Sequence, residues 1–208
     1  MGQPTRPAYN PGMAAPRWSI HKFALLFALA LLARGVPAAD SGTVSLRGFT
    51  NDLGQVIEAD SPRGATTLMV FGYTTCPDVC PLTLVAVHQA LAQLAKRGLS
   101  CDVAFVTVDP DRDTGQILTS YLDTFVKGRG VALRTTDPAQ QQTAQEAFRV
   151  VAKRVPDGDT YSFEHTAVTY VVDDTGTVVV EWPFGTSSAT MAHDMEILLS
   201  GDGQAATR

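Results

Sequence analysis

The chain has 208 residues, of which 45% are hydrophobic and 18% are charged. This composition excludes a disordered or fibrous protein and suits one ordinary domain. The net charge of −5 does not favour a phosphate-binding surface, so we expect no nucleic-acid partner, and three cysteines are too few for a disulfide scaffold.

The N-terminal segment differs from the rest of the chain. Residues 1–38 contain four basic and no acidic residues, and residues 23–33 are eleven apolar residues in a row. Arg17 and Lys22 precede this run, and the small-residue sequence Val36-Pro37-Ala38 follows it. The layout predicts a signal peptide over 1–38, with an uncleaved membrane anchor as the alternative, because a spanning helix needs about 20 apolar residues. We therefore expect a periplasmic protein, either free after cleavage or tethered to the inner membrane.

Predicted strands and helices alternate along the mature chain, for which we expect one domain over 39–201 and a disordered tail over 202–208. Their order indicates a mixed α/β sheet that is mainly parallel and covered on both faces, with an N-terminal hairpin and a late antiparallel hairpin. A thioredoxin-like sandwich has this order, and so do several other mixed-sheet folds. The predicted strands are 66–73, 102–108, 131–134, 166–172 and 177–182, the helices are 81–97, 113–126, 138–152 and 186–199, and a hairpin turn lies at 51–54 within 43–60.

Two cysteines flank the point where the first buried strand ends and a helix begins, in Cys76-Pro77-Asp78-Val79-Cys80. Residues four apart on a helical turn lie about 5–6 Å apart between Cβ atoms, which suits two thiolates on one metal ion. The spacing is also close to disulfide geometry, so the pair could switch between dithiol and disulfide. We expect the helix N-terminus to lower the pKa values of both thiols. Two alternatives remain open here: a pair of buried structural cysteines and a structural disulfide without metal.

A histidine is the natural third ligand for such a pair. Soft thiolates favour Cu(I), whereas zinc prefers four ligands. His165 ends the polar loop predicted at 159–165, which a thioredoxin-like sheet would bring beside the cysteine turn. His21 belongs to the predicted signal, His88 lies too far along the helix, and His193 is expected to face solvent.

The remaining polar motif receives a structural interpretation. Asp109, Asp111 and Asp113 lack the ligand number and glycine spacing of a calcium loop, and Asp113 is expected to cap the next helix. Cys101, which precedes the second strand, is expected to be a buried small hydrophobic residue.

Four segments of the chain are familiar together: Phe71–Pro81, Val106–Thr114, Val155–Gly176 and Phe184–Ser187. They resemble the Sco/SenC family over most of residues 47–199. The resemblance implies a thioredoxin-like fold and one copper ion bound by Cys76, Cys80 and His165. It also implies a role in assembling the binuclear copper centre of cytochrome c oxidase subunit II. The expected partners are therefore the subunit II copper domain, a thioredoxin-like reductant and another periplasmic copper chaperone.

The chain departs from the family pattern in two places. Many members keep a membrane-spanning anchor, and the apolar run here is short for one. Glu164 and Thr166 flank the histidine where Asp and Ser are common in the family.

Two functions compete on these residues. A copper metallochaperone, which is not an enzyme, would bind the metal and pass it to a partner's thiolates. A thiol–disulfide oxidoreductase would instead act on a partner's cysteine pair, with Cys76 and Cys80 as its redox-active pair. Enzymes of that type use two residues between the thiols, whereas three intervene here and a histidine is added, so the pattern favours metal binding. Peroxidase chemistry would need a single low-pKa cysteine, which the paired arrangement does not favour.

Overall fold

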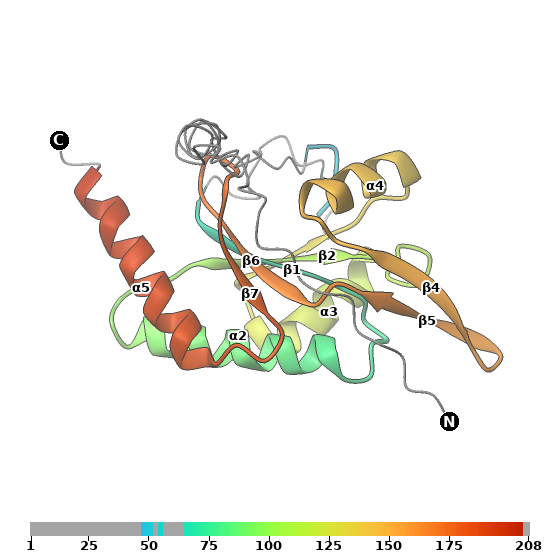
Figure 1. Cartoon of the computed structure of the whole chain (residues 1–208), viewed down its shortest axis with the longest axis horizontal. Coiled ribbons are helices and arrows are strands. Elements are labelled where there is room, and N and C mark those ends of the chain that lie inside the picture. Colours follow the sequence, from blue (N-terminus) through green and yellow to red (C-terminus); the bar gives the residue numbers. More distant parts are fainter. Residues whose placement is uncertain (1–46, 52–53, 56–64, 206–208) are drawn as a thin grey trace, which may run out of the picture. The chain divides into compact units, whose positions relative to one another are not determined.

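A mixed β-sheet forms the centre of the computed structural model, which describes residues 47–51, 54–55 and 65–205 (Figure 1). In this part of the chain the strand order is β3-β2-β1-β6-β7. The first three strands are mutually parallel, β6 is antiparallel to β1, and β7 is antiparallel to β6. The strands are β1 (Thr67–Gly72), β2 (Asp102–Thr107), β3 (Gly130–Leu133), β6 (Val168–Val172) and β7 (Val178–Pro183).

Helices cover both faces of this sheet, as the sequence predicts (Figure 1). One buried cluster joins α2 (Val79–Ala95), α3 (Gly115–Val126) and α5 (Ser188–Ala205) to alternate strand residues such as Leu68 and Val70. The other cluster joins α4 (Pro138–Ala147) to the strand residues between them, such as Met69 and Phe71. All six residues of β1 are buried because β1 is the central strand. The arrangement is the predicted thioredoxin-like sandwich.

A second, two-stranded sheet was not predicted. β4 (Ala152–Asp157) and β5 (Thr160–His165) form an antiparallel hairpin with Gly158 and Asp159 at its turn. The sequence-based expectations of a helix over 138–152 and a loop over 159–165 are therefore wrong. The helix ends at Ala147, because Arg149 adopts the left-handed conformation with φ 54° and the chain turns away.

The chain ends match the expectations only in part. The turn at 51–54 is present, since Gly54 N donates to Asn51 O over 3.0 Å, and Thr50 makes an antiparallel bridge to Arg134. Much of the hairpin expected around it and the predicted signal over 1–38 lie outside the described residues. α5 extends to Ala205, so the final helix ends later than expected and enters the segment assigned to a disordered tail. No helix within the described ranges is both long and apolar enough to cross a membrane.

The final helix is fastened to the sheet and to α2 by polar contacts. Trp182 of β7 donates its indole N–H to Asp194 of α5 over 3.0 Å, and Arg97 after α2 pairs with Glu196 of α5.

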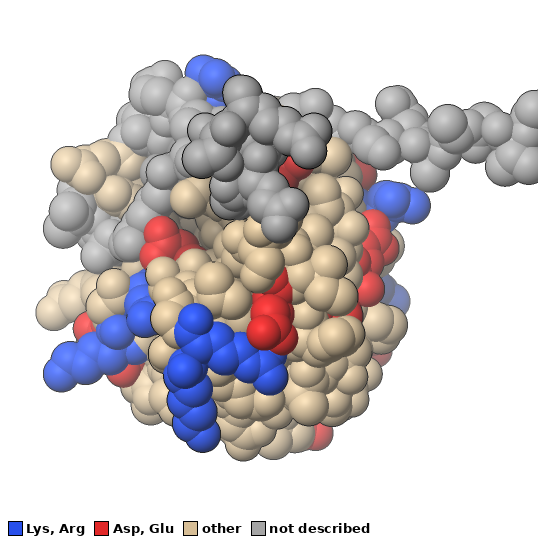
Figure 2. All heavy atoms as spheres, turned by 90° about the vertical axis from the view of Figure 1, so that its left-hand side faces the viewer, with Lys and Arg blue, Asp and Glu red and all other residues tan. Residues whose placement is uncertain are grey.

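On the face shown in Figure 2, basic and acidic side chains lie beside one another instead of forming a surface of one charge sign.

Candidate metal centre

The turn between β1 and α2 carries both motif cysteines. Cys76 N donates to Tyr73 O over 3.2 Å and closes the turn, and Cys80 is the second residue of α2. The Cys80 amide points at the first thiol, with 3.5 Å between Cys80 N and Cys76 Sγ. Cys76 is half-buried, whereas Cys80 is only 1% exposed. The two thiols therefore differ in access, with Cys76 as the outer one.

Gly72, the last residue of β1, makes room for the inner thiol. A Cβ at this position would lie 2.7 Å from Cys80 Sγ and 2.9 Å from Phe105 Cζ, closer than real Cβ atoms approach other atoms. Glycine is therefore required here by the close approach of backbone and sulfur.

His165 comes from a different element, the last position of β5, where it pairs with Ala152 of β4. Its Nδ1 lies 3.0 Å from the carbonyl oxygen of Thr166, so the neutral ring donates from Nδ1 and leaves the lone pair of Nε2 free to bind. That Nε2 lies 3.5 Å from Cys80 Sγ. The Tyr73 ring packs edge-on against the imidazole, with 5.9 Å between ring centroids.

The three predicted ligand residues thus come together. Cys76 Sγ, Cys80 Sγ and one His165 ring nitrogen all lie within 4.8 Å of one another, and they are the one such group of His, Cys, Asp or Glu found among the described residues. The group could hold one copper ion, because two soft sulfur donors and one imidazole suit this metal.

Burial sets the protonation of these ligands. It raises the pKa of the Cys80 thiol well above its ordinary value, and it lowers the pKa of His165, against a smaller opposing effect of the Thr166 hydrogen bond. At neutral pH the metal-free site therefore holds a protonated Cys80 and a neutral His165. The expectation that the helix N-terminus lowers the pKa of both thiols is wrong for Cys80, because desolvation is the larger effect.

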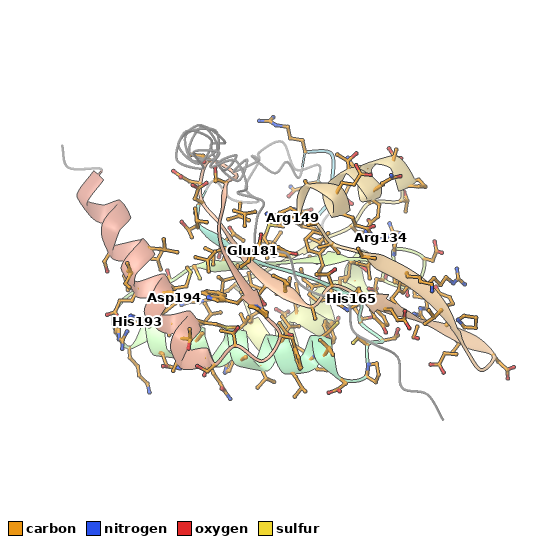
Figure 3. All side chains as sticks on the ribbon, viewed as in Figure 1. Arg134, Arg149, His165, Glu181, His193 and Asp194 are labelled. Carbon is orange, nitrogen blue, oxygen red and sulfur yellow. The ribbon has the colours of Figure 1, made fainter. Side chains whose placement is uncertain are left out.

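The other candidates lie where the sequence places them. His88 and His193 are exposed, and Figure 3 shows His193 on α5, well away from His165. Cys101 is buried as expected. It precedes β2 and so lies at the opposite end of the parallel strands from the cysteine turn, which follows β1. Burial raises the pKa of the Cys101 thiol to about 12.

Asp113 does not cap α3, which corrects the expectation from sequence. Thr114 is the N-cap, and its hydroxyl accepts from Ile117 N. Asp113 is fully buried and accepts hydrogen bonds from Thr74 N at 3.1 Å, Thr74 Oγ1 at 2.5 Å and Thr107 Oγ1 at 2.5 Å. The carboxylate therefore fastens the cysteine turn, two residues before Cys76, to the end of β2.

The sequence analysis also missed a polar group around the His165 hairpin. Asp109 is 1% exposed, pairs with Arg112 Nε and accepts from the Tyr161 hydroxyl over 2.9 Å. Tyr73 joins the hairpin directly, because its hydroxyl lies 3.3 Å from Phe163 N and 3.4 Å from Phe163 O. The Gly158-Asp159 turn between two short segments was the one sequence signal that could have revealed this hairpin.

Comparison with known proteins places this geometry in a family. A family model described as SCO1/SenC matches residues 46–200. The SCO2-like protein of Rickettsia prowazekii is 32% identical over 126 residues, which cover 59% of this chain and 60% of that protein. The match therefore spans about 60% of the length of that curated relative.

Solved structures agree with the family match. Copper-bound ScoI from Bradyrhizobium japonicum is 35% identical, with a TM-score of 0.61 over 71% of this chain and 94% of that one. Copper-bound ScoI from Arabidopsis thaliana is 22% identical and shares the fold, with a TM-score of 0.67 over 74% of this chain and 96% of that one. With its thioredoxin-like fold and its Cys-Cys-His group, the chain belongs to the SCO1/SenC family.

Proposed function

We propose that the chain is an exported metallochaperone that binds one copper ion through Cys76 Sγ, Cys80 Sγ and His165 Nε2. The observation that carries this proposal is the approach of these three donors, from two separate elements, to within 4.8 Å of one another. Two thiolates suit Cu(I), and the imidazole supplies the third ligand that Cu(II) needs. Copper in the related ScoI structure from Bradyrhizobium japonicum supports the choice of metal.

The same geometry suits release of the metal as cargo. Copper binding must displace the proton that burial keeps on Cys80, while His165 is already neutral and its Nδ1–H is held by Thr166. Cys76 is half-exposed, so an incoming thiolate of a partner reaches the copper ion from the Cys76 side. The ligands can then be exchanged one at a time without uncovering Cys80.

The proposed client is the copper domain of cytochrome c oxidase subunit II, to which the chain delivers copper or whose cysteines it prepares. Family membership supports this client. So does BsSco, described as a member of the Sco family of cytochrome c oxidase assembly proteins, which shares the fold at 18% identity and a TM-score of 0.59. In this scheme a thioredoxin-like reductant keeps the two thiols reduced, and another periplasmic copper chaperone supplies the metal.

A transfer experiment tests the proposal. The reduced chain is loaded anaerobically with one equivalent of copper, mixed with the metal-free copper domain of subunit II, and separated from it before copper is measured in each protein. We expect copper to move to subunit II from the wild type, and no loading of the Cys76→Ser, Cys80→Ser double variant. Copper that stays on the chain, with subunit II unchanged, would contradict the proposal.

Thiol–disulfide exchange is the second candidate function, favoured by one observation: a half-exposed Cys76 beside a buried Cys80 gives one accessible and one protected thiol. The copper-free reduced chain would then convert a disulfide in subunit II to two thiols, while Cys76 and Cys80 are oxidised to a disulfide. If that conversion occurs and copper transfer does not, the second candidate replaces the first.

We propose the periplasm as the site of action, with residues 1–38 acting as the export signal. The short apolar run and the small residues before Ala39 support this location. Mass spectrometry of the exported protein should find a mature start near Ala39. An intact N-terminus in the membrane fraction would instead support the retained anchor.

A further inference from the structure

The hairpin that carries His165 stands apart from the main sheet. Among the described residues, β4 and β5 hydrogen-bond to each other and not to the five-stranded sheet, and in Figure 1 the hairpin extends beyond that sheet. The start of β6 at Val168 fixes the base of the hairpin. The direction in which β5 leaves that base, and with it the orientation of His165, depends on side-chain contacts.

Two parts of the molecule supply those contacts. Tyr73 packs on Phe163 and His165 in the half of β5 near its base. Residues 108–114 between β2 and α3, here called the β2–α3 connector, hold Thr160 and Tyr161 at the other end of β5. Arg112 Nη1 donates to Tyr161 O over 2.9 Å and lies 3.4 Å from Thr160 Oγ1. Its guanidinium also lies over the Tyr161 ring, 3.8 Å from the centroid. Asp109 completes the link, because it pairs with Arg112 and accepts from the Tyr161 hydroxyl over 2.9 Å.

The same connector holds the cysteine half of the site through Asp113, whose carboxylate accepts hydrogen bonds from both the amide and the hydroxyl of Thr74. The cysteine turn and the His165 hairpin are therefore both attached to one short stretch of chain. Their separation is set by the distance along the connector between Asp113 and the Asp109–Arg112 pair.

The connector itself is firmly held. Arg134, at the end of β3, donates to Pro110 O over 2.9 Å from Nη2 and 3.2 Å from Nε. Val108 N donates to Gly72 O over 2.8 Å, and Gln141 of α4 donates to the carbonyl of Thr107, the β2 residue directly before the connector, over 2.9 Å. A segment fixed by two neighbouring elements and by β1 gives both halves of the site a common rigid reference.

We propose that Arg112, acting with Asp109 and Tyr161, is a positioning residue that holds the imidazole of His165 against the thiol pair. The proposal rests on the proposed function, in which these three residues share one copper ion. Loss of the link lets β5 swing and removes the imidazole from the shared site while leaving the two thiols in place. Because two thiolates alone satisfy Cu(I), the loss should act on Cu(II) far more than on Cu(I).

The test compares Cu(I) and Cu(II) binding by the full chain and five variants. Arg112→Gln removes the link from the connector side, and Tyr161→Ala removes it from the hairpin side while leaving the Arg112–Asp109 pair intact. Arg154→Gln is the matched control: Arg154 also lies over the Tyr161 ring, at 3.4 Å, but it pairs with Asp111 of the connector, whose side chain is 79% exposed, and not with the buried Asp109. His165→Ala defines the result of losing the imidazole altogether.

We expect Arg112→Gln and Tyr161→Ala to weaken Cu(II) binding about tenfold or more, as losses of ligand-orienting partners do, and to shift the Cu(II) spectrum toward that of His165→Ala. Cu(I) binding should stay near that of the wild type, and Arg154→Gln should match the wild type in both states. Arg112→Lys keeps the charge without the planar fork and should restore only part of the effect.

Hydrogen exchange of the metal-free chains supplies a readout that does not depend on copper. Amides of residues 160–165 should exchange faster in Arg112→Gln and Tyr161→Ala, while those of β1 and β2 stay protected. Wild-type Cu(II) spectra and wild-type exchange in Tyr161→Ala would overturn the positioning role and leave the proposed function standing. If His165→Ala binds Cu(II) as the wild type does, the proposed function itself fails.

Discussion

At the scale of single residues, Cys80 is the proposed ligand whose chemistry the fold changes most. It is 1% exposed, and burial raises its pKa, so the metal-free thiol keeps its proton at neutral pH. Its hydrogen-bond partner is His165 Nε2 at 3.5 Å, the atom that would also face the metal. Copper binding thus exchanges an S–H···N contact for two bonds to the metal and releases a proton.

Copper affinity should therefore rise with pH. A group that is protonated in the free site and deprotonated in the complex gives about a tenfold gain in affinity per pH unit for each proton released. We expect at least the Cys80 proton to contribute between about pH 6 and 8, where burial keeps it bound. Competition titrations across this range measure the slope, with Cys101→Ser as the control that leaves it unchanged. An affinity independent of pH would contradict a protonated Cys80.

Replacing His165 by Ala should affect the two oxidation states unequally. Cu(I) retains two thiolates and should lose little affinity, whereas Cu(II) loses the imidazole and should be bound at least about tenfold more weakly. Absorption and paramagnetic resonance of the Cu(II) form check this, with His88→Ala as an exposed histidine control. Unchanged Cu(II) spectra in His165→Ala would remove this residue from the site.

The grouping of Cys76, Cys80 and His165 could be predicted from sequence because their types, their spacing and the place of the turn agree. The protonation of Cys80 could not, since it depends on burial in the cluster that includes Tyr73 and beside His165 of the hairpin, which no local pattern reveals. Asp113 was misjudged for a similar reason: an acidic residue before a helix favours a cap, and only the fold shows that Thr74 and Thr107 surround it.

At the scale of elements, the β4–β5 hairpin was the largest omission. Its strands show little apolar alternation, and Pro156 within β4 argues against a strand. The hairpin is stabilised instead by a cation–π contact with Arg112 of the connector and an aromatic contact with Tyr73, which are long-range and leave no period in the sequence. The main strands and the helices α2 and α3, by contrast, bury regular apolar faces and were placed within a few residues.

The junction between β1 and α2 depends on Gly72. A methyl group there would press on Cys80 Sγ at 2.7 Å, so Gly72→Ala should destabilise the fold by about 1–3 kcal/mol, as overpacking does, and should also displace the inner ligand. Urea unfolding and copper titration measure the two effects. Gly201→Ala is the control, because a Cβ there meets no atom within 4 Å. Wild-type stability and copper affinity in Gly72→Ala would show that the sulfur is not confined as described.

At the scale of the whole molecule, the thioredoxin-like topology brings segments that are distant in sequence to the same end of the sheet. β1 and β2 are parallel, so the cysteine turn and the β2–α3 connector leave the sheet at the same end. Cys101 lies before β2 at the other end, which separates the third thiol from the site. The sequence could predict this separation from the strand order alone.

The cysteine pair should form a disulfide that is reduced more easily than a structural one. A ring that closes across only three intervening residues gains little from chain entropy, and burial favours the protonated, reduced Cys80. Structural disulfides typically have reduction potentials below about −300 mV. Redox titration of the metal-free chain carrying Cys101→Ser should therefore give a reduction potential above this limit. A potential well below that limit would indicate a permanent crosslink.

The coordination of bound copper tests the central claim most directly. X-ray absorption spectroscopy of the reduced chain loaded with one equivalent of Cu(II) should show two sulfur neighbours and an imidazole nitrogen, and His165→Ala should lose the imidazole signal while keeping both sulfurs. This result would establish Cys76, Cys80 and His165 as one shared site. A copper ion with fewer than two sulfur neighbours, or an imidazole signal that survives His165→Ala, would contradict it.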